Sequence, residues 1–69
     1  MSKRMVTIDL YPGKEIILGK DGGIRVYTVK ELKKNFVVCS MEGKYDETFT
    51  YRTLQDIKQG KNRDYEWIA

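Results

Sequence analysis

Few residues of this 69-residue chain could carry out catalysis. The sequence contains no histidine, the usual general acid or base at neutral pH, and only one cysteine, Cys39. Without a histidine, Cys39 would need a basic neighbour to become a thiolate nucleophile, but Val37, Val38 and Met41 beside it are apolar. We therefore expect Cys39 to be buried, hydrophobic in behaviour and chemically inert.

Acidic residues and glycines offer little more chemistry. The two close acidic pairs are Asp46 with Glu47 and Asp64 with Glu66. Both fall in predicted loop or terminal segments, whereas a carboxyl group acting as a general acid needs burial to raise its pKa. One cysteine without histidine cannot supply a tetrahedral zinc site, and no GxGxxG or Walker sequence is present. We expect no enzyme, metal or cofactor.

Basic residues gather in two segments of the sequence. The first segment, predicted as one loop, holds Lys30, Lys33 and Lys34. The second surrounds a predicted C-terminal helix and holds Arg52, Lys58, Lys61 and Arg63. The formal charge of +3 and the pI near 9.1 permit an anionic partner without requiring one.

Aromatic residues extend this pattern toward nucleic acid. Tyr27, Tyr51 and Tyr65 fall on predicted strands, where their rings could stack on unpaired bases, as in small β modules that bind single-stranded RNA. Two other interpretations stay open. The lysines could serve solubility alone. A small protein-binding inhibitor or adaptor, of the kind that phages encode, could use Tyr27, Tyr65 and Trp67 and an open sheet edge against a host protein.

The elements that would position these residues are mainly strands. Alternating or continuous apolar runs predict strands at 5–11, 15–18, 24–29, 36–41 and 47–52, after a flexible start at 1–4. Turns are predicted at Pro12-Gly13, as type II, and at the hairpin Lys20–Gly23. A short helix is predicted at 53–60, with Thr53 as its cap and Gly60 as its end. Residues 61–69 are a tail or an extra strand, and residues 28–34 are open between a loop and a helical turn.

These elements predict one all-β domain spanning 1–69. It is a small five- to six-stranded antiparallel barrel or sandwich with one short C-terminal helix. A hydrophobic share of 41% argues against disorder, but a core of this size gives marginal stability, so we expect a homodimer. The lone cysteine and the absence of a long apolar run predict a cytoplasmic protein without a membrane segment.

The segment from Met5 to Gly19, MVTIDLYPGKEIILG, resembles the carbon storage regulator (CsrA/RsmA) family in its strand, turn and apolar strand ending in glycine. The resemblance implies an intertwined homodimer that binds GGA-bearing loops in messenger RNA. It matches Arg52 to the family's arginine at the end of the fifth strand and Ile8 to an aliphatic contact in the first. Leu10 and Tyr11 stand where the family carries basic residues.

The sequence therefore predicts a non-enzymatic regulatory binding module whose ligand is single-stranded or loop RNA. The predicted RNA-binding residues are Arg52, Lys58, Lys61, Arg63, Lys30, Lys33, Lys34 and Ile8. The protein-binding alternative uses Tyr27, Tyr65 and Trp67.

Overall fold

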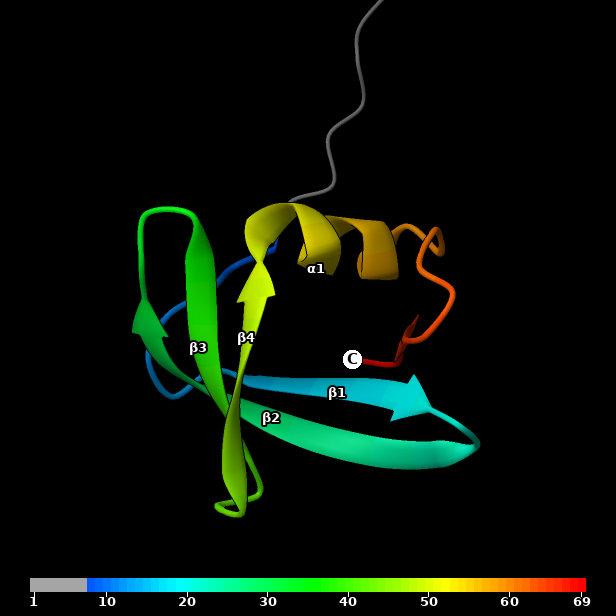
Figure 1. Cartoon of the computed structure of the whole chain (residues 1–69), viewed down its shortest axis with the longest axis horizontal. Coiled ribbons are helices and arrows are strands. Elements are labelled where there is room, and N and C mark those ends of the chain that lie inside the picture. Colours follow the sequence, from blue (N-terminus) through cyan, green and yellow to red (C-terminus); the bar gives the residue numbers. More distant parts are fainter. Residues whose placement is uncertain (1–7) are drawn as a thin grey trace, which may run out of the picture.

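The computed structural model describes residues 8–69 as one open, strongly twisted antiparallel sheet with a helix at one end (Figure 1). The strands are β1 (Glu15–Lys20), β2 (Gly23–Leu32), β3 (Phe36–Met41), β4 (Tyr45–Thr50) and β5 (Glu66–Trp67), and the helix is α1 (Tyr51–Lys58). The sheet order is β4-β3-β2-β1-β5, so β1 to β4 form a meander and β5 returns to pair with β1. This arrangement confirms the predicted fold class. The flexible start predicted at 1–4 lies outside the described residues.

Both predicted tight turns are confirmed. At Pro12-Gly13, the N–H of Lys14 donates to the carbonyl oxygen of Tyr11 at 2.9 Å, and Gly13 has φ +96°. These values define a type II turn. The β1–β2 hairpin turns through Asp21-Gly22, which have φ +53° and +78°. Two successive positive φ angles define a type I′ turn, whose twist matches that of the paired strands.

The strand predicted at 5–11 is not part of the sheet as far as it can be followed. Its first three residues lie outside the described part of the chain, and residues 8–11 are irregular. The position beside β1 belongs instead to β5, where Leu18 stands opposite Trp67 and Gly19 opposite Glu66. The extra strand expected within 61–69 is therefore confirmed. Ile8 and Leu10 pack against the core from outside the sheet.

The helical alternative for residues 28–34 is wrong because β2 continues to Leu32. Val37 and Val38 of β3 stand opposite Leu32 and Glu31, which gives the end of β2 a paired neighbour. The register shifts between Val29 and Glu31, and such a bulge bends the strand. The loop proper is restricted to residues 33–35, so Lys30 does not share it with Lys33 and Lys34.

The last long strand and the helix both begin two residues earlier than predicted. Thr50, rather than Thr53, is the N-cap, and its side-chain oxygen accepts from the N–H of Thr53 at 3.1 Å. Arg52 consequently lies in the first turn of α1 and not at the end of a strand.

Gly60 ends the helix as predicted. The N–H of Gly60 donates to the carbonyl oxygen of Ile57 at 3.1 Å, and the N–H of Lys61 donates to the carbonyl oxygen of Asp56 at 2.8 Å. This pair of bonds is a Schellman motif, and Gly60 takes the left-handed φ of +79° that the motif requires.

The core lies between the inner face of the sheet and α1. Successive side chains of β2 point to opposite faces of the sheet. Tyr27 and Val29 point into the core, whereas Ile24 and Val26 point away from it. Leu54 and Ile57 are the buried residues of the helix. The buried set consists of Ile16, Leu18, Tyr27, Val29, Val37, Cys39, Phe49, Leu54 and Ile57. No helix within residues 8–69 is long and apolar enough to cross a membrane.

We predict that Thr50→Ala lowers the free energy of unfolding by about 1 kcal/mol, because an N-cap side chain satisfies an otherwise free helix amide. Thr50→Ser is the matched control, since it keeps the hydroxyl group and should unfold close to the wild type. Urea unfolding followed by circular dichroism measures both. Equal destabilisation by the two variants would contradict the capping role.

Candidate binding surface

A carboxylate on the inner face of β4 connects the two edge regions of the sheet. Glu47 accepts a hydrogen bond from Tyr27 Oη at 3.0 Å through Oε1, and from Tyr65 Oη at 2.6 Å through Oε2. The ring of Phe49 makes edge contacts with both tyrosine rings, at centroid distances of 5.2 and 5.7 Å. Because Tyr65 directly precedes β5, this cluster spans the open side between β4 and β5.

Both phenols of this cluster stay protonated at neutral pH. Burial raises the pKa of Tyr27. Burial, and then the hydrogen bond to Glu47, raises the pKa of Tyr65. Each hydroxyl group therefore keeps its proton and donates to Glu47 at neutral pH. The cluster positions the segment before β5 and has no nucleophile.

The structure corrects the predicted role of two tyrosines. Tyr27 is fully buried, so it cannot stack on a base or contact a partner. Tyr51 begins α1 instead of lying on a strand, and its hydroxyl group donates to the carbonyl oxygen of Lys33. Tyr51, Tyr65 and Trp67 are all partly exposed, and of these Tyr65 and Trp67 lie beside each other before and in β5.

Two hollows flank the segment 62–66. The hairpin hollow, of about 440 Å³, lies between residues 19–24 and residues 62–66 with Ile68. The helix hollow, of about 390 Å³, lies between the end of α1 and the same segment. Its lining residues are Ile57, Lys58, Gly60, Asn62, Tyr65, Glu66 and Trp67.

Asn62 gives the wall between the hollows a fixed shape. Its Oδ1 accepts from the N–H of Asp64 at 2.8 Å and from the N–H of Tyr65 at 2.9 Å. An asparagine side chain that binds the backbone two and three residues later closes a local turn. Tyr65 and Glu66 are thereby presented to both hollows.

Lysine ammonium groups lie over both aromatic rings of this region. Lys20 Nζ is 4.7 Å from the centroid of the Tyr65 ring, and Lys58 Nζ is 5.3 Å from that of Trp67. Lys61 follows α1 between two residues that line the helix hollow, and Arg63 lines the hairpin hollow. Neither Lys61 nor Arg63 has an ion-pair partner within residues 8–69.

The structure brings together only part of the predicted basic surface. Lys58, Lys61 and Arg63 surround the segment 62–66, whereas Arg52 lies at the opposite end of α1. Ile8 packs against the core.

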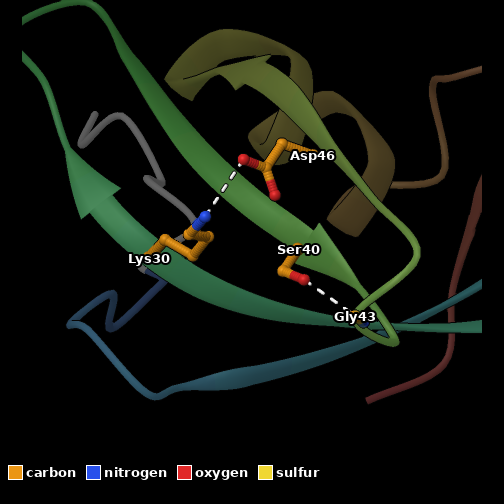
Figure 2. Close-up of polar contacts among 4 residues, drawn as sticks. All are labelled: Lys30, Ser40, Gly43 and Asp46. Carbon is orange, nitrogen blue, oxygen red and sulfur yellow. Dashed lines mark hydrogen bonds and ion pairs between the residues drawn. The ribbon is translucent and has the colours of Figure 1, made fainter.

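The other basic segment is largely neutralised. Lys30 of β2 pairs with Asp46 of β4 at 3.0 Å, across the sheet face that points away from α1 (Figure 2). Lys33 pairs with Glu31 at 2.9 Å, and Lys34 is exposed at the tip of the β2–β3 hairpin. The candidate site around segment 62–66 therefore does not include Lys30, Lys33 or Lys34.

Sequence reasoning missed an aliphatic surface on the outer face of β1, β2 and β5. We call it the outer patch, and its residues are Ile17, Gly19, Ile24, Val26 and Ile68. Ile24 is 66% exposed and Ile68 is 47% exposed. Apolar residues on both faces of β2 were the available signal, because Ile24 and Val26 alternate with the buried Tyr27 and Val29. Lys20 and Asn62 were also missed.

No family model, curated protein or solved structure matches this chain. Within the described residues, no group of three or more histidine, cysteine, aspartate or glutamate side chains could hold a metal ion. The candidate surface offers aromatic rings, cationic side chains and the Glu66 carboxylate.

We predict that Glu47→Gln lowers the free energy of unfolding by about 1–3 kcal/mol, since the amide nitrogen cannot accept and one buried tyrosine hydroxyl loses its partner. Asp46→Asn is the neighbouring control. It removes only a half-exposed ion pair, which contributes about 0–1 kcal/mol. Chemical unfolding of both variants tests the difference. A smaller effect at Glu47 than at Asp46 would contradict the bridging role.

Cys39 is fully buried, and burial, with the nearby charge of Glu47, raises the pKa of its thiol to about 11. We predict that the native protein reacts with a thiol reagent at pH 8 far more slowly than the urea-unfolded chain. The unfolded thiol ionises near pH 8.5, so between that pH and about 11 the folded state binds more protons. Stability should therefore fall as pH rises through this window, and less so in Cys39→Ala. Rapid labelling of the native protein would contradict the prediction.

Proposed function

We propose that the protein is a non-enzymatic regulatory module that binds single-stranded or loop RNA, in the cytoplasm, through the helix hollow. One observation carries the proposal: two partly exposed aromatic rings, Tyr65 and Trp67, line a single hollow bordered by basic side chains. Every base has a π face, so an aromatic platform of this kind accepts unpaired nucleotides with little sequence preference.

The lysine above Trp67 fits the same role. A base that stacks on the Trp67 ring takes the place of the Lys58 ammonium group, which then contacts a neighbouring phosphate. Lys61 and Arg63 supply two further phosphate contacts from the same segment. Glu66 lines the hollow and offers a carboxylate to an exocyclic amino group of a base.

The resemblance to the CsrA/RsmA family supports the same ligand class but assigns it to Arg52 and Ile8. Arg52 is exposed in the first turn of α1, and Ile8 is partly buried against the core. The residues around the helix hollow are better placed to form one continuous contact, so the proposal rests on them. The intertwined dimer of that family stays a prediction.

A protein-binding inhibitor or adaptor is the second candidate function. The exposed aliphatic residues Ile24 and Ile68 favour it, because contiguous exposed apolar surface marks interaction sites. Such a partner would use the rim residues Tyr65 and Trp67 without any dependence on phosphate.

The test uses Trp67, the chain's one tryptophan, as the reporter. We expect single-stranded RNA to quench its fluorescence, and duplex RNA of the same sequence to do so much less, because stacking needs an unpaired base. Combined Lys61→Glu and Arg63→Glu should abolish most of the affinity. Each lost phosphate contact should also reduce the salt slope of binding by about 0.7.

The matched control is combined Lys33→Glu and Lys34→Glu, which changes the charge equally at the far hairpin and should leave RNA binding nearly unaltered. Equal losses in the two double variants would mean diffuse electrostatic attraction. Absence of any binding tighter than about 10⁻⁴ M would overturn the RNA proposal in favour of the protein-binding one.

A further inference from the structure

The outer patch is an aliphatic surface in which Ile24 and Ile68 are exposed and Ile17 and Val26 are partly exposed. Ile17 stands directly opposite Val26, and Gly19 directly opposite Ile24. Ile68 reaches this face from beyond β5, since a Cβ placed on Gly19 would meet Ile68 Cδ1 at 3.3 Å. A side chain at position 19 would therefore push the end of Ile68 away from the sheet by a few tenths of an ångström.

The patch holds a protruding side chain and a hollow side by side. Ile24 is the most exposed large apolar residue among those described, at 66%, and it stands at the border of the hairpin hollow. The same hollow is bordered by Gly19 and Ile68. A surface that presents both a knob and a hollow is complementary to its own copy related by a two-fold axis, because each knob then enters the other's hollow.

The rim of the hairpin hollow carries charges of both signs. Lys20 and Arg63 are basic, and Asp21, Asp64 and Glu66 are acidic. A rim of one sign would repel a second copy, whereas this rim can pair with itself across a two-fold axis. Ile24 and Ile68 border the same hollow, so exposed aliphatic side chains lie beside this charged rim, as in many protein interfaces.

We infer that the outer patch is the face through which two copies of this chain associate, with Ile24 of each copy seated in the hairpin hollow of the other. The contact is face to face between outer sheet surfaces. It differs from an intertwined dimer, because each chain keeps all five of its own strands. The two hollows share the wall of segment 62–66, but Ile24 and Ile68, which carry this inference, do not line the helix hollow, so the inference does not depend on the RNA proposal.

The experiment measures the dimer dissociation constant by sedimentation equilibrium from low micromolar to millimolar concentration. We expect the wild type to dimerise reversibly, and Ile24→Glu and Ile68→Glu each to weaken the dimer at least about tenfold, as for a residue at the centre of an interface. Leu32→Glu is the control, since Leu32 is 40% exposed at the far end of β2, outside the patch. It should leave the constant unchanged.

A second measurement locates the contact in the wild-type protein. On dilution, backbone amide shifts should change mainly at Gly19, Ile24 and Ile68. A wild type that is monomeric at all concentrations overturns the inference, and so does a dimer that tolerates both patch variants. Retention of RNA binding by monomeric Ile24→Glu would separate this inference from the proposed function, whereas a patch-dependent dimer without RNA affinity would leave the interface standing alone.

Discussion

The five-stranded sheet is open between its edge strands β4 and β5. The fold depends on the two hydrogen bonds to Glu47 that bridge this opening. The edge strands β4 and β5 do not pair, and the hydrogen bond from Tyr65 to Glu47 ties the segment before β5 to β4. Tyr27 holds the same carboxylate through the second hydrogen bond, and the Tyr27 side chain is itself buried in the core. Once Tyr65 is fixed, the turn closed by Asn62 and the place of Trp67 beside Leu18 follow. Both hollows are bordered by the segment that this partly buried cluster holds in place.

The same strand serves two surfaces because alternate residues of a strand point to opposite faces. In β1, Leu18 faces the core beside Trp67, while Gly19 faces outward beneath Ile68. A ligand in the helix hollow and a second copy in the hairpin hollow would thus lie on either side of the segment 62–66. If both proposals hold, the dimer would carry two helix hollows and would gain affinity only when both bind segments of one RNA strand of sufficient length.

Local chemistry made much of the fold predictable from the sequence. Pro12-Gly13 and Asp21-Gly22 specify their turns through φ, the run 36–41 matches β3 in its exact bounds, and Gly60 ends the helix. The predictions that proved wrong were choices between two segments with equivalent local signals. Thr50 and Thr53 are both competent caps, and packing of Leu54 and Ile57 decides between them. The runs 5–11 and 65–68 both suit the place beside β1, and nothing local favours the second. Tyr27 is predicted to stack on a base or contact a partner, yet it is buried, and Glu47, twenty residues away, accepts from its hydroxyl group on the inner face.

The charge of the folded part constrains how RNA can be bound. Lys3 and Arg4 account for two of the thirteen basic residues, so positions 8–69 hold eleven basic against ten acidic residues. Counterion release from a near-neutral surface yields little affinity, and three cations beside the helix hollow cannot hold a duplex at physiological salt. Stacking contributes about 1–3 kcal/mol for each base and does not depend on net charge. Under the RNA proposal, this protein would therefore obtain most of its affinity at the rings of Tyr65 and Trp67, where stacking needs an unpaired nucleotide. Asp64 and Glu66 on the same segment would strengthen this preference. They repel phosphate groups, and only a stacked, unpaired base compensates for that repulsion.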